Sequence, residues 1–268
     1  MKGCCLAIYF RSARMIATLL LLFGCFFVHA LGQGALGCKK TLKLGVGEPW
    51  PPFVFGGPNN FSGIDIDITR LVFSKLNYCL EFIKLPSSAR GLQELKKGEI
   101  DFLNAASFNE DRATIGLYSI PYRSEAMRIF YHVKNKQKFR QQTLYDLLHQ
   151  DFIGVVNLGA YYGPEFEAIV AENTFSKQIT SVPSVEQRMK MLEQHHVDFV
   201  IEDIIPGRYY IQQKQKFNIE MLPIVVHDNP IYFLFSRKTI SQEQVNQLNQ
   251  VIMQSQADID AVVDNYIF

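Results

Sequence analysis

Strand-like and helix-like segments alternate along most of this 268-residue chain, and that alternation limits the folds open to it. In the first half the strand candidates are 41–47 (TLKLGVG), 79–85 (CLEFIKL) and 100–105 (IDFLNA), separated by helix candidates at 63–77 and 88–98. Strands that alternate with helices form βαβ units around a mainly parallel sheet. We therefore predict an α/β fold.

The same alternation recurs in the second half of the chain. Its strand candidates are 152–159, 177–182 and 197–203, its helix candidates are 163–173 and 184–196, and one long helix is expected from Ser241 to the end. Two such regions predict two lobes, each with a mainly parallel sheet flanked by helices.

Two extended stretches, 126–136 and 229–238, are expected to connect the lobes as a two-strand hinge. The first lobe would then comprise residues 39–125 and a return segment, 231–268, and the second lobe would comprise residues 126–230. A chain that enters the second lobe and returns to the first leaves a cleft between them.

Residues 1–30 have the composition of a secretory signal peptide. They contain three basic residues and no acidic one, and the apolar run from Met15 to Val28 is followed by His29 and Ala30, with small residues at the cleavage positions. We expect cleavage after Ala30 and a periplasmic location. A retained membrane anchor and a lipoprotein modified at Cys38 are the alternatives.

Charge and cysteine content agree with an exported protein. Removing three basic residues from the 27 in the chain leaves 24 against 26 acidic residues, a net charge of about −2. Because the sequence has no basic stripe, nucleic acid is not an expected partner.

Cys38 and Cys79 each precede a strand candidate, so neighbouring parallel strands would bring them together as a disulfide. The alternative is two unrelated buried thiols.

Candidate ligand-binding residues follow several of the expected strands. Trp50 lies among prolines, which limit the entropy lost on fixing its ring. Ser107 follows the third strand, and the planar guanidinium of Arg112 is suited to a carboxylate. The carboxyl ends of strands are the usual ligand sites in open α/β sheets.

The second lobe offers a further set of candidates. Gly159 and Ala160 follow a strand, where backbone amides can approach a ligand, and the carboxylate of Asp203 ends another strand, where it could bind an ammonium group or cap the next helix. His195 and His196 lack a third metal ligand, so no metal site is predicted. The motifs GxSxG, HExxH, CxxC and the Walker loop are absent from the sequence, and we expect neither enzymatic activity nor a cofactor.

Several segments together resemble one family. LGVGEPWPPFVF, GIDIDITRLVFSKL, LQELKKGEIDFLNAASFNEDR, LYSIPYR and VDFVIED occur in the order and spacing of the periplasmic amino-acid-binding proteins, solute-binding family 3, over roughly residues 40–268. The resemblance implies the type II periplasmic-binding-protein fold, a monomer, an amino-acid-like ligand and a membrane ABC permease as partner. It also implies that Trp50 packs on the ligand, that Arg112 with Ser107 binds the α-carboxylate, and that Asp203 binds the α-ammonium group.

The sequence departs from the family pattern where the ligand side chain would lie. Ile64 replaces a second stacking aromatic residue, and Ala160 replaces a small hydroxyl residue and is followed by Tyr161 and Tyr162. These changes indicate an atypical amino acid or another small polar compound.

Two other functions remain open at this stage. Some cyclohexadienyl dehydratases resemble the same family, and Glu48, Glu202 or Asp203 could act as the general acid or base that such chemistry needs. A sensor that acts on a membrane receptor in trans is the other alternative.

Overall fold

The computed structural model describes residues 37–57, 60–139, 143–172, 175 and 177–266. The predicted signal peptide, residues 1–30, lies outside these residues. All the elements below belong to one compact unit, Lys39–Phe268. Within the described part of the chain, no helix has the length and apolar character that crossing a membrane would require.

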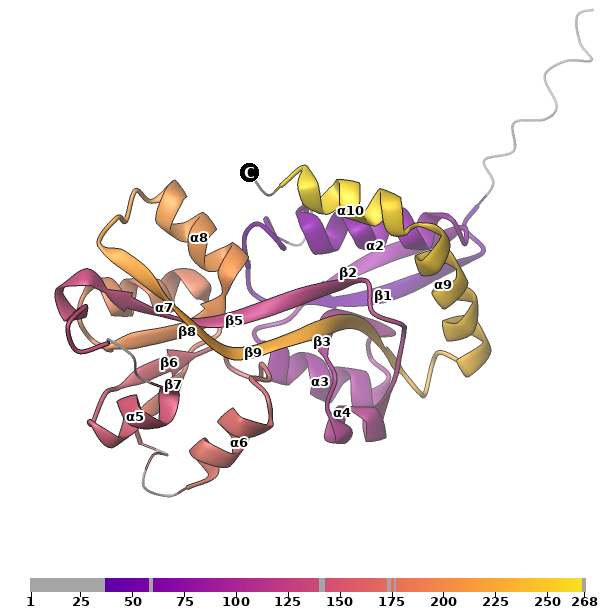
Figure 1. The fold of residues 1–268 in the computed structure, drawn as a ribbon. Helices are drawn as coiled ribbons and strands as arrows, with labels where there is room; N and C mark the ends of the chain where they lie inside the picture. The colour runs from indigo at the N-terminus through magenta and orange to yellow at the C-terminus, as the bar shows by residue number, and fades with distance from the viewer. Residues whose placement is uncertain (1–36, 58–59, 140–142, 173–174, 176, 267–268) are drawn as a thin grey trace, which may run out of the picture. The chain divides into compact units, whose positions relative to one another are not determined.

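Nine strands of the described residues form one sheet (Figure 1). They are β1 (Lys40–Val46), β2 (Tyr78–Lys84), β3 (Phe102–Ser107), β4 (Gly116–Tyr118), β5 (Arg123–His132), β6 (Gly154–Val156), β7 (Ile179–Ser181), β8 (Phe199–Asp203) and β9 (Ile219–Ser236). Their order is β2-β1-β3-β9-β5-β8-β6-β7, with β4 also paired to β9. The β1–β2, β1–β3, β6–β7 and β6–β8 pairs are parallel, as the βαβ pattern predicts.

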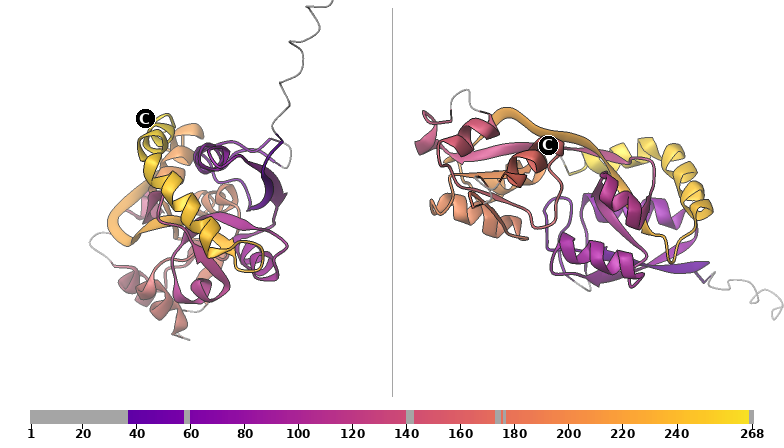
Figure 2. Two further views of the ribbon diagram at one scale, coloured as in Figure 1. Left: turned by 90° about the vertical axis from the view of Figure 1, so that its right-hand side faces the viewer. Right: turned by 90° about the horizontal axis from the view of Figure 1, so that it is seen from below.

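The helices connect and cover these strands (Figures 1 and 2). They are α2 (Ile64–Ser74), α3 (Ser88–Lys97), α4 (Glu110–Ile115), α5 (Leu144–His149), α6 (Pro164–Ala171), α7 (Val185–Glu193), α8 (Ile204–Gln213), α9 (Gln242–Gln254) and α10 (Gln256–Asp264), with one 3₁₀ turn, η1 (Val133–Asn135). The single long helix predicted after Ser241 is therefore two helices, α9 and α10. They meet at Ser255, whose hydroxyl accepts a hydrogen bond from Lys75 Nζ at 2.9 Å.

Strands β5 and β9 run through both halves of the sheet. They pair in antiparallel register from Arg123 with Ile231 to His132 with Ile219, and β9 then continues to pair with β3 and β4. We call β1–β4 with α2–α4, α9 and α10 the first lobe, and β6–β8 with α5–α8 the second lobe. The two long strands carry the chain from one lobe to the other.

In the first lobe, hydrophobic cores lie on both faces of the sheet. Phe233 and Phe235 of β9 face α2, α9 and α10 together with Phe102, whereas Leu234 between them faces α3 together with Leu95. This alternation follows from the two-residue period of a strand. Helices α2 and α10 lie side by side over one face (Figure 1), and they are in contact.

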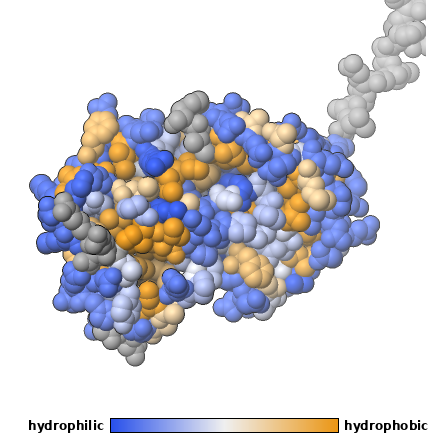
Figure 3. All heavy atoms as spheres, in the orientation of Figure 1, coloured by the Kyte–Doolittle hydropathy of each residue, from blue (hydrophilic) through white to orange (hydrophobic). Residues whose placement is uncertain are grey.

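The second lobe is layered in the same way. On β5, Ile129 and Tyr131 face the core beneath α5 and α6, and Phe130 faces the core beneath α7 and α8. A groove beside the first of these cores is lined largely by apolar side chains of β9, α5 and α6, including Val225 and Phe166. Apolar side chains also gather on this part of the surface in Figure 3.

Cys38 and Cys79 form a disulfide, which confirms the prediction from sequence. The parallel register of β1 and β2 places Lys40 opposite Tyr78, and the Lys39 amide donates to the Asn77 carbonyl at 2.8 Å. The starts of the two strands are therefore adjacent, which is what a short covalent link between them requires.

Replacing both cysteines by serine should lower the free energy of unfolding by about 2–4 kcal/mol, because the disulfide closes a loop of about 40 residues in the unfolded chain. Urea unfolding with and without reductant would measure this. The native protein should lose stability on reduction and the double variant should not. Equal unfolding free energies for the two proteins would contradict the prediction.

Candidate ligand-binding site

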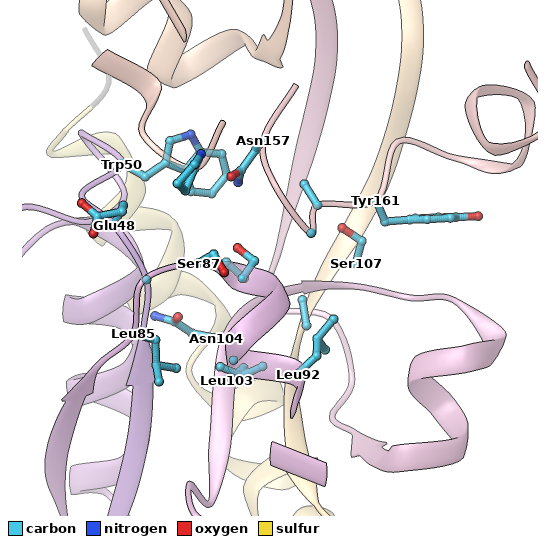
Figure 4. A pocket seen from close by; sticks show the side chains of 18 of the residues that line it. Glu48, Trp50, Leu85, Ser87, Leu92, Leu103, Asn104, Ser107, Asn157 and Tyr161 are labelled. Carbon is cyan, nitrogen blue, oxygen red and sulfur yellow. The ribbon is translucent and has the colours of Figure 1, made fainter. Parts of the chain in front are cut away.

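A pocket lies at the carboxyl ends of strands from both lobes. It is lined by residues that follow or end β1 (Gly47, Glu48, Trp50), β3 (Asn104, Ala105, Ser107), β6 (Asn157, Gly159, Ala160, Tyr161) and β8 (Glu202), with Ser87 and Ser88 at the start of α3, Arg112 on α4, and Glu125 and Met127 on β5. In Figure 4, Trp50 and Asn157 lie across the pocket from Leu85 and Leu103. The cavity measures about 130 Å³, a size suited to a small molecule.

Arg112 presents a buried guanidinium to this pocket. Asn109 caps α4 by accepting a hydrogen bond from the Arg112 amide at 2.8 Å, which fixes the residue within the first turn. Its side chain donates from Nη1 to the Ser107 carbonyl and from Nη2 to the Gly159 carbonyl, each at 3.0 Å. The residue is only 9% exposed, and among the described carboxylates none forms an ion pair with it. Burial lowers the pKa of Arg112.

The contact between Arg112 and Gly159 joins the two lobes. Gly159 has φ +85°, in the left-handed region, and a Cβ there would lie 2.4 Å from the backbone nitrogen of Ala89 on α3. Glycine is therefore required both for the turn and for this close approach. The loop after β6 lies directly against the first lobe.

Trp50 is held by contacts with both lobes. Its backbone pairs with Val54, and its ring lies 4.7 Å from that of Phe53. The guanidinium of Arg123 lies 3.9 Å from the Phe53 ring centre and forms a buried two-point ion pair with Asp65, which raises the pKa of Arg123. The tryptophan ring contacts cores of both lobes and lines the pocket.

The indole N–H of Trp50 donates to Glu202 Oε1 at 2.9 Å, across the lobes. The same oxygen accepts from the Asp203 amide at 3.1 Å, and Oε2 pairs with Arg188, which is almost fully buried on α7. Arg188 also donates to the carbonyls of Val182 and Pro183. The charge of Glu202 is thus already compensated within the protein.

Replacing Arg188 by leucine should lower the free energy of unfolding by about 3–5 kcal/mol, because it leaves the Glu202 carboxylate buried without its counter-ion. The matched control is Lys190→Leu on the same helix, whose pair with Glu186 is exposed and should change stability by less than about 1 kcal/mol. Chemical denaturation of the two variants measures the difference. Equal losses would show that the buried pair has no special role.

Two of the predicted site residues line the pocket with their polar groups already engaged. The Ser107 hydroxyl donates to Glu125 Oε1 at 2.8 Å, and the Ala160 amide donates to the Asn157 carbonyl at 3.2 Å. Neither group is free to donate to a ligand in this arrangement. Within β3, the pocket-lining residue Ala105 has φ +52°, a strained conformation for a residue other than glycine.

The structure does not bring Asp203 into this pocket. One oxygen of its carboxylate caps α8 by accepting from the Ile205 amide at 2.7 Å, and the other accepts from the Ala126 amide at 2.9 Å. The residue lines an adjoining surface cavity with Asp228 and Asn229, and Glu125 lines both this cavity and the pocket. Burial raises the pKa of Asp203 to about 6. The expected pairing of Arg112 and Asp203 around one ligand is therefore not the arrangement observed.

Glu125 is the pocket carboxylate that the sequence analysis missed. It lies on β5, is 5% exposed, and accepts a hydrogen bond from Ser107. Burial raises its pKa to about 7. A single acidic residue in the otherwise apolar and basic run RSEAMRIF was the available signal. Asn104 also lines the pocket, and its buried Nδ2 has no hydrogen-bond partner in the described protein.

The arrangement can hold a small molecule that carries a carboxylate. It offers the guanidinium of Arg112 and the side-chain amide of Asn104 as donors, with an aromatic face at Trp50 and a buried carboxyl group at Glu125. Within the described residues, no group of three or more histidine, cysteine, aspartate or glutamate side chains is placed to hold a metal ion.

This chain belongs to the bacterial extracellular solute-binding proteins, family 3, whose family model matches residues 42–266. The match covers both lobes and all the pocket residues described above. No curated protein sequence matches the chain significantly.

Solved structures of similar fold include the following three proteins. The ligand-binding core of GluR0 in complex with L-glutamate is 22% identical, with a TM-score of 0.71 over 85% of this chain and 98% of that chain. A mutant of ArgBP from T. maritima is 17% identical, with a TM-score of 0.71 over 84% and 94%. The ancestral amino-acid-binding protein AncCDT-1, a precursor of cyclohexadienyl dehydratase, is 20% identical, with a TM-score of 0.70 over 85% and 96%. These likenesses confirm the type II periplasmic-binding-protein fold.

Proposed function

We propose that this protein binds a small amino acid or a related zwitterion between its two lobes and performs no chemistry on it. The single observation that carries the proposal is the buried guanidinium of Arg112, which has carbonyl groups but no carboxylate as partners within the described protein. As part of the same proposal, residues 1–30 are removed on export to the periplasm, and the monomeric protein delivers its ligand to an ABC permease.

Physical chemistry supports a carboxylate as the group that Arg112 binds. Two of the five N–H donors of its guanidinium have the carbonyl partners described above, and the planar fork can present others to both oxygens of a carboxylate. A buried cation without a counter-ion is costly, and a ligand carboxylate would remove that cost. Trp50 would then cover one face of the ligand, as the family resemblance implies.

Contacts from both lobes support binding by lobe closure. Arg112 reaches the Gly159 carbonyl, and Trp50 reaches Glu202, so the pocket is complete only when the lobes are together. A ligand that touches both walls binds the closed form more tightly than the open form. That difference in affinity is what shifts the equilibrium toward closure.

Replacing Arg112 by alanine should weaken binding by about 2–4 kcal/mol, because the ligand carboxylate loses its charged partner in a desolvated site. A thermal-shift screen of the twenty L-amino acids and related small acids would first find ligands, and calorimetry would then compare the variant with the native protein. Arg237→Ala, which removes an exposed arginine that binds the Ala113 carbonyl, is the control. Unchanged affinity in Arg112→Ala would refute the assignment.

A dehydratase is the second candidate, and Glu125 is the observation that favours it. A buried carboxyl group with a pKa of about 7 in a ligand pocket has the properties of a general acid. Incubation with prephenate and arogenate tests this alternative directly. We expect no turnover; turnover that disappears in Glu125→Gln would establish the enzyme instead.

A further inference from the structure

We propose that the carboxylate of Glu125, rather than that of Asp203, is the partner of the ligand's ammonium group, so that this pocket selects zwitterions over simple carboxylates. The inference rests on the proposed function and names the residue that decides its specificity. It rests on a comparison of Glu125 with the other carboxylates that the described structure places in or beside the pocket.

The other carboxylates near the pocket are already satisfied. Both oxygens of Glu202 are taken up by Arg188, Trp50 and a backbone amide. Both oxygens of Asp203 accept backbone amides outside the pocket. Glu48 is partly exposed, and its Oε1 lies 3.9 Å from Lys84 Nζ. Solvent and that cation therefore both stabilise its negative charge.

Glu125 differs from Glu48 and Glu202 because it has no ion pair in the part of the chain that the structure describes, and it differs from Asp203 because it lines the pocket. Among the described residues, the nearby Arg123 is committed to Asp65 by a two-point ion pair, and Arg112 is bound to carbonyl groups. The side chains of Ser107 and Asn229 interact with the carboxylate, which has about four acceptor sites. Capacity therefore remains for the N–H groups of a ligand ammonium.

The cation and the carboxylate of the pocket meet at one residue. Arg112 donates to the carbonyl of Ser107, and the hydroxyl of Ser107 donates to Glu125. The two charges thus lie on either side of a single residue in one small cavity. The carboxylate and ammonium groups of an α-amino acid are likewise separated by one carbon atom, so a single such molecule presents the complementary pair of charges.

Binding of an ammonium group should be coupled to the protonation of Glu125. Burial raises its pKa to about 7, opposed by Arg123 on β5 and by the side chains of Ser107 and Asn229, whereas the carboxylate of Asp203 on β8 raises it further. On α4, Arg112 is the cation that interacts with it. A bound ammonium group favours the ionised form and lowers this pKa, so a proton is released on binding near neutral pH.

The remaining charged or titratable groups around Glu125 are either paired or not ionised near neutral pH. Asp228, which lines the adjoining cavity, forms an ion pair with Arg128. Tyr162, in the loop after β6, has its pKa raised above its usual value by burial, so its hydroxyl stays neutral. Among these groups, Glu125 and Asp203 are the ones left to titrate around neutral pH.

The test is a calorimetric comparison of matched ligand pairs from about pH 5.5 to about pH 8.5. The probes are L-alanine, L-glutamine and L-leucine, each beside its carboxylate without the amino group: propionate, 4-carbamoylbutanoate and 4-methylpentanoate. The amino acids should bind up to about tenfold more tightly for each pH unit gained below about pH 7, with no further gain above it. The simple carboxylates should bind more weakly and should not gain affinity as the pH rises.

Glu125→Gln should abolish both the pH dependence and the preference for amino acids, while its amide can still accept the Ser107 hydroxyl and so preserve the local packing. The control is Glu99→Gln, an exposed carboxylate just before β3, which should retain both properties. Asp203→Asn should also retain a pH dependence, shifted to lower pH because the Asp203 carboxylate helps to raise the pKa of Glu125. Circular dichroism would verify that each variant is folded.

The outcomes separate the inference from the proposed function. Amino acids that bind with the same affinity at every pH, or a Glu125→Gln variant that keeps the pH dependence, would overturn the role of Glu125 alone. Loss of amino-acid preference in Asp203→Asn but not in Glu125→Gln would return that role to Asp203. Simple carboxylates that bind as tightly as the amino acids would refute the selection of zwitterions. Binding of neither series would overturn both proposals.

Discussion

The antiparallel pairing of β5 with β9 is the constraint on which the rest of the structure depends. Within the described residues, β9 carries buried side chains into the cores of both lobes, with Phe233 and Phe235 in the first lobe and Leu222 in the second. Its partner β5 contributes Ile129 and Phe130 to the cores of the second lobe. Because strand side chains alternate between faces, the pair fixes at once which helices cover each face in each lobe. It also carries Glu125 and Met127 into the pocket, at the place where the chain passes from one lobe to the other. The same pair of strands therefore organises the fold and forms part of the pocket.

Local periodicity and chain order were enough to predict much of this arrangement. The alternating patterns predicted the βαβ units, and the position of each cysteine just before a strand predicted the disulfide between Cys38 and Cys79. Trp50 and Arg112, expected near strand ends, line the pocket, and their roles in ligand binding stay predictions. Each of these features depends on residues close in sequence, or on the rule that parallel strands align their carboxyl ends. The extended stretch expected from residue 229 proved to begin at Ile219, because pairing with β5 prolongs β9 well into the second lobe.

The choice among carboxylates could not be read from the sequence. Glu202 and Asp203 are adjacent on β8, so their side chains leave opposite faces of the sheet, and the sequence does not say which face meets the pocket. The answer comes from distant partners: Arg188 on α7 and Trp50 after β1 hold Glu202, and backbone amides hold Asp203. Among the described residues, Glu125, not Asp203, is therefore the carboxylate without an ion pair that lines the pocket. Sequence spacing locates the edge of a sheet, but side-chain pairing decides what remains free there.

The pairing of buried charges explains why the difference between paired and unpaired carboxylates matters chemically. Arg123 with Asp65 and Arg188 with Glu202 are buried pairs, each neutralised within the protein, and they shape the walls around Trp50. Arg112 and Glu125 are equally buried but have no such partners among the described residues, although they stand on either side of Ser107. Burying an unpaired charge is unfavourable. The protein can tolerate it here only because few groups are involved and because protonation of Glu125 can remove its negative charge. A ligand that supplies both missing charges at once relieves both penalties, and one that supplies a single charge leaves the other in place.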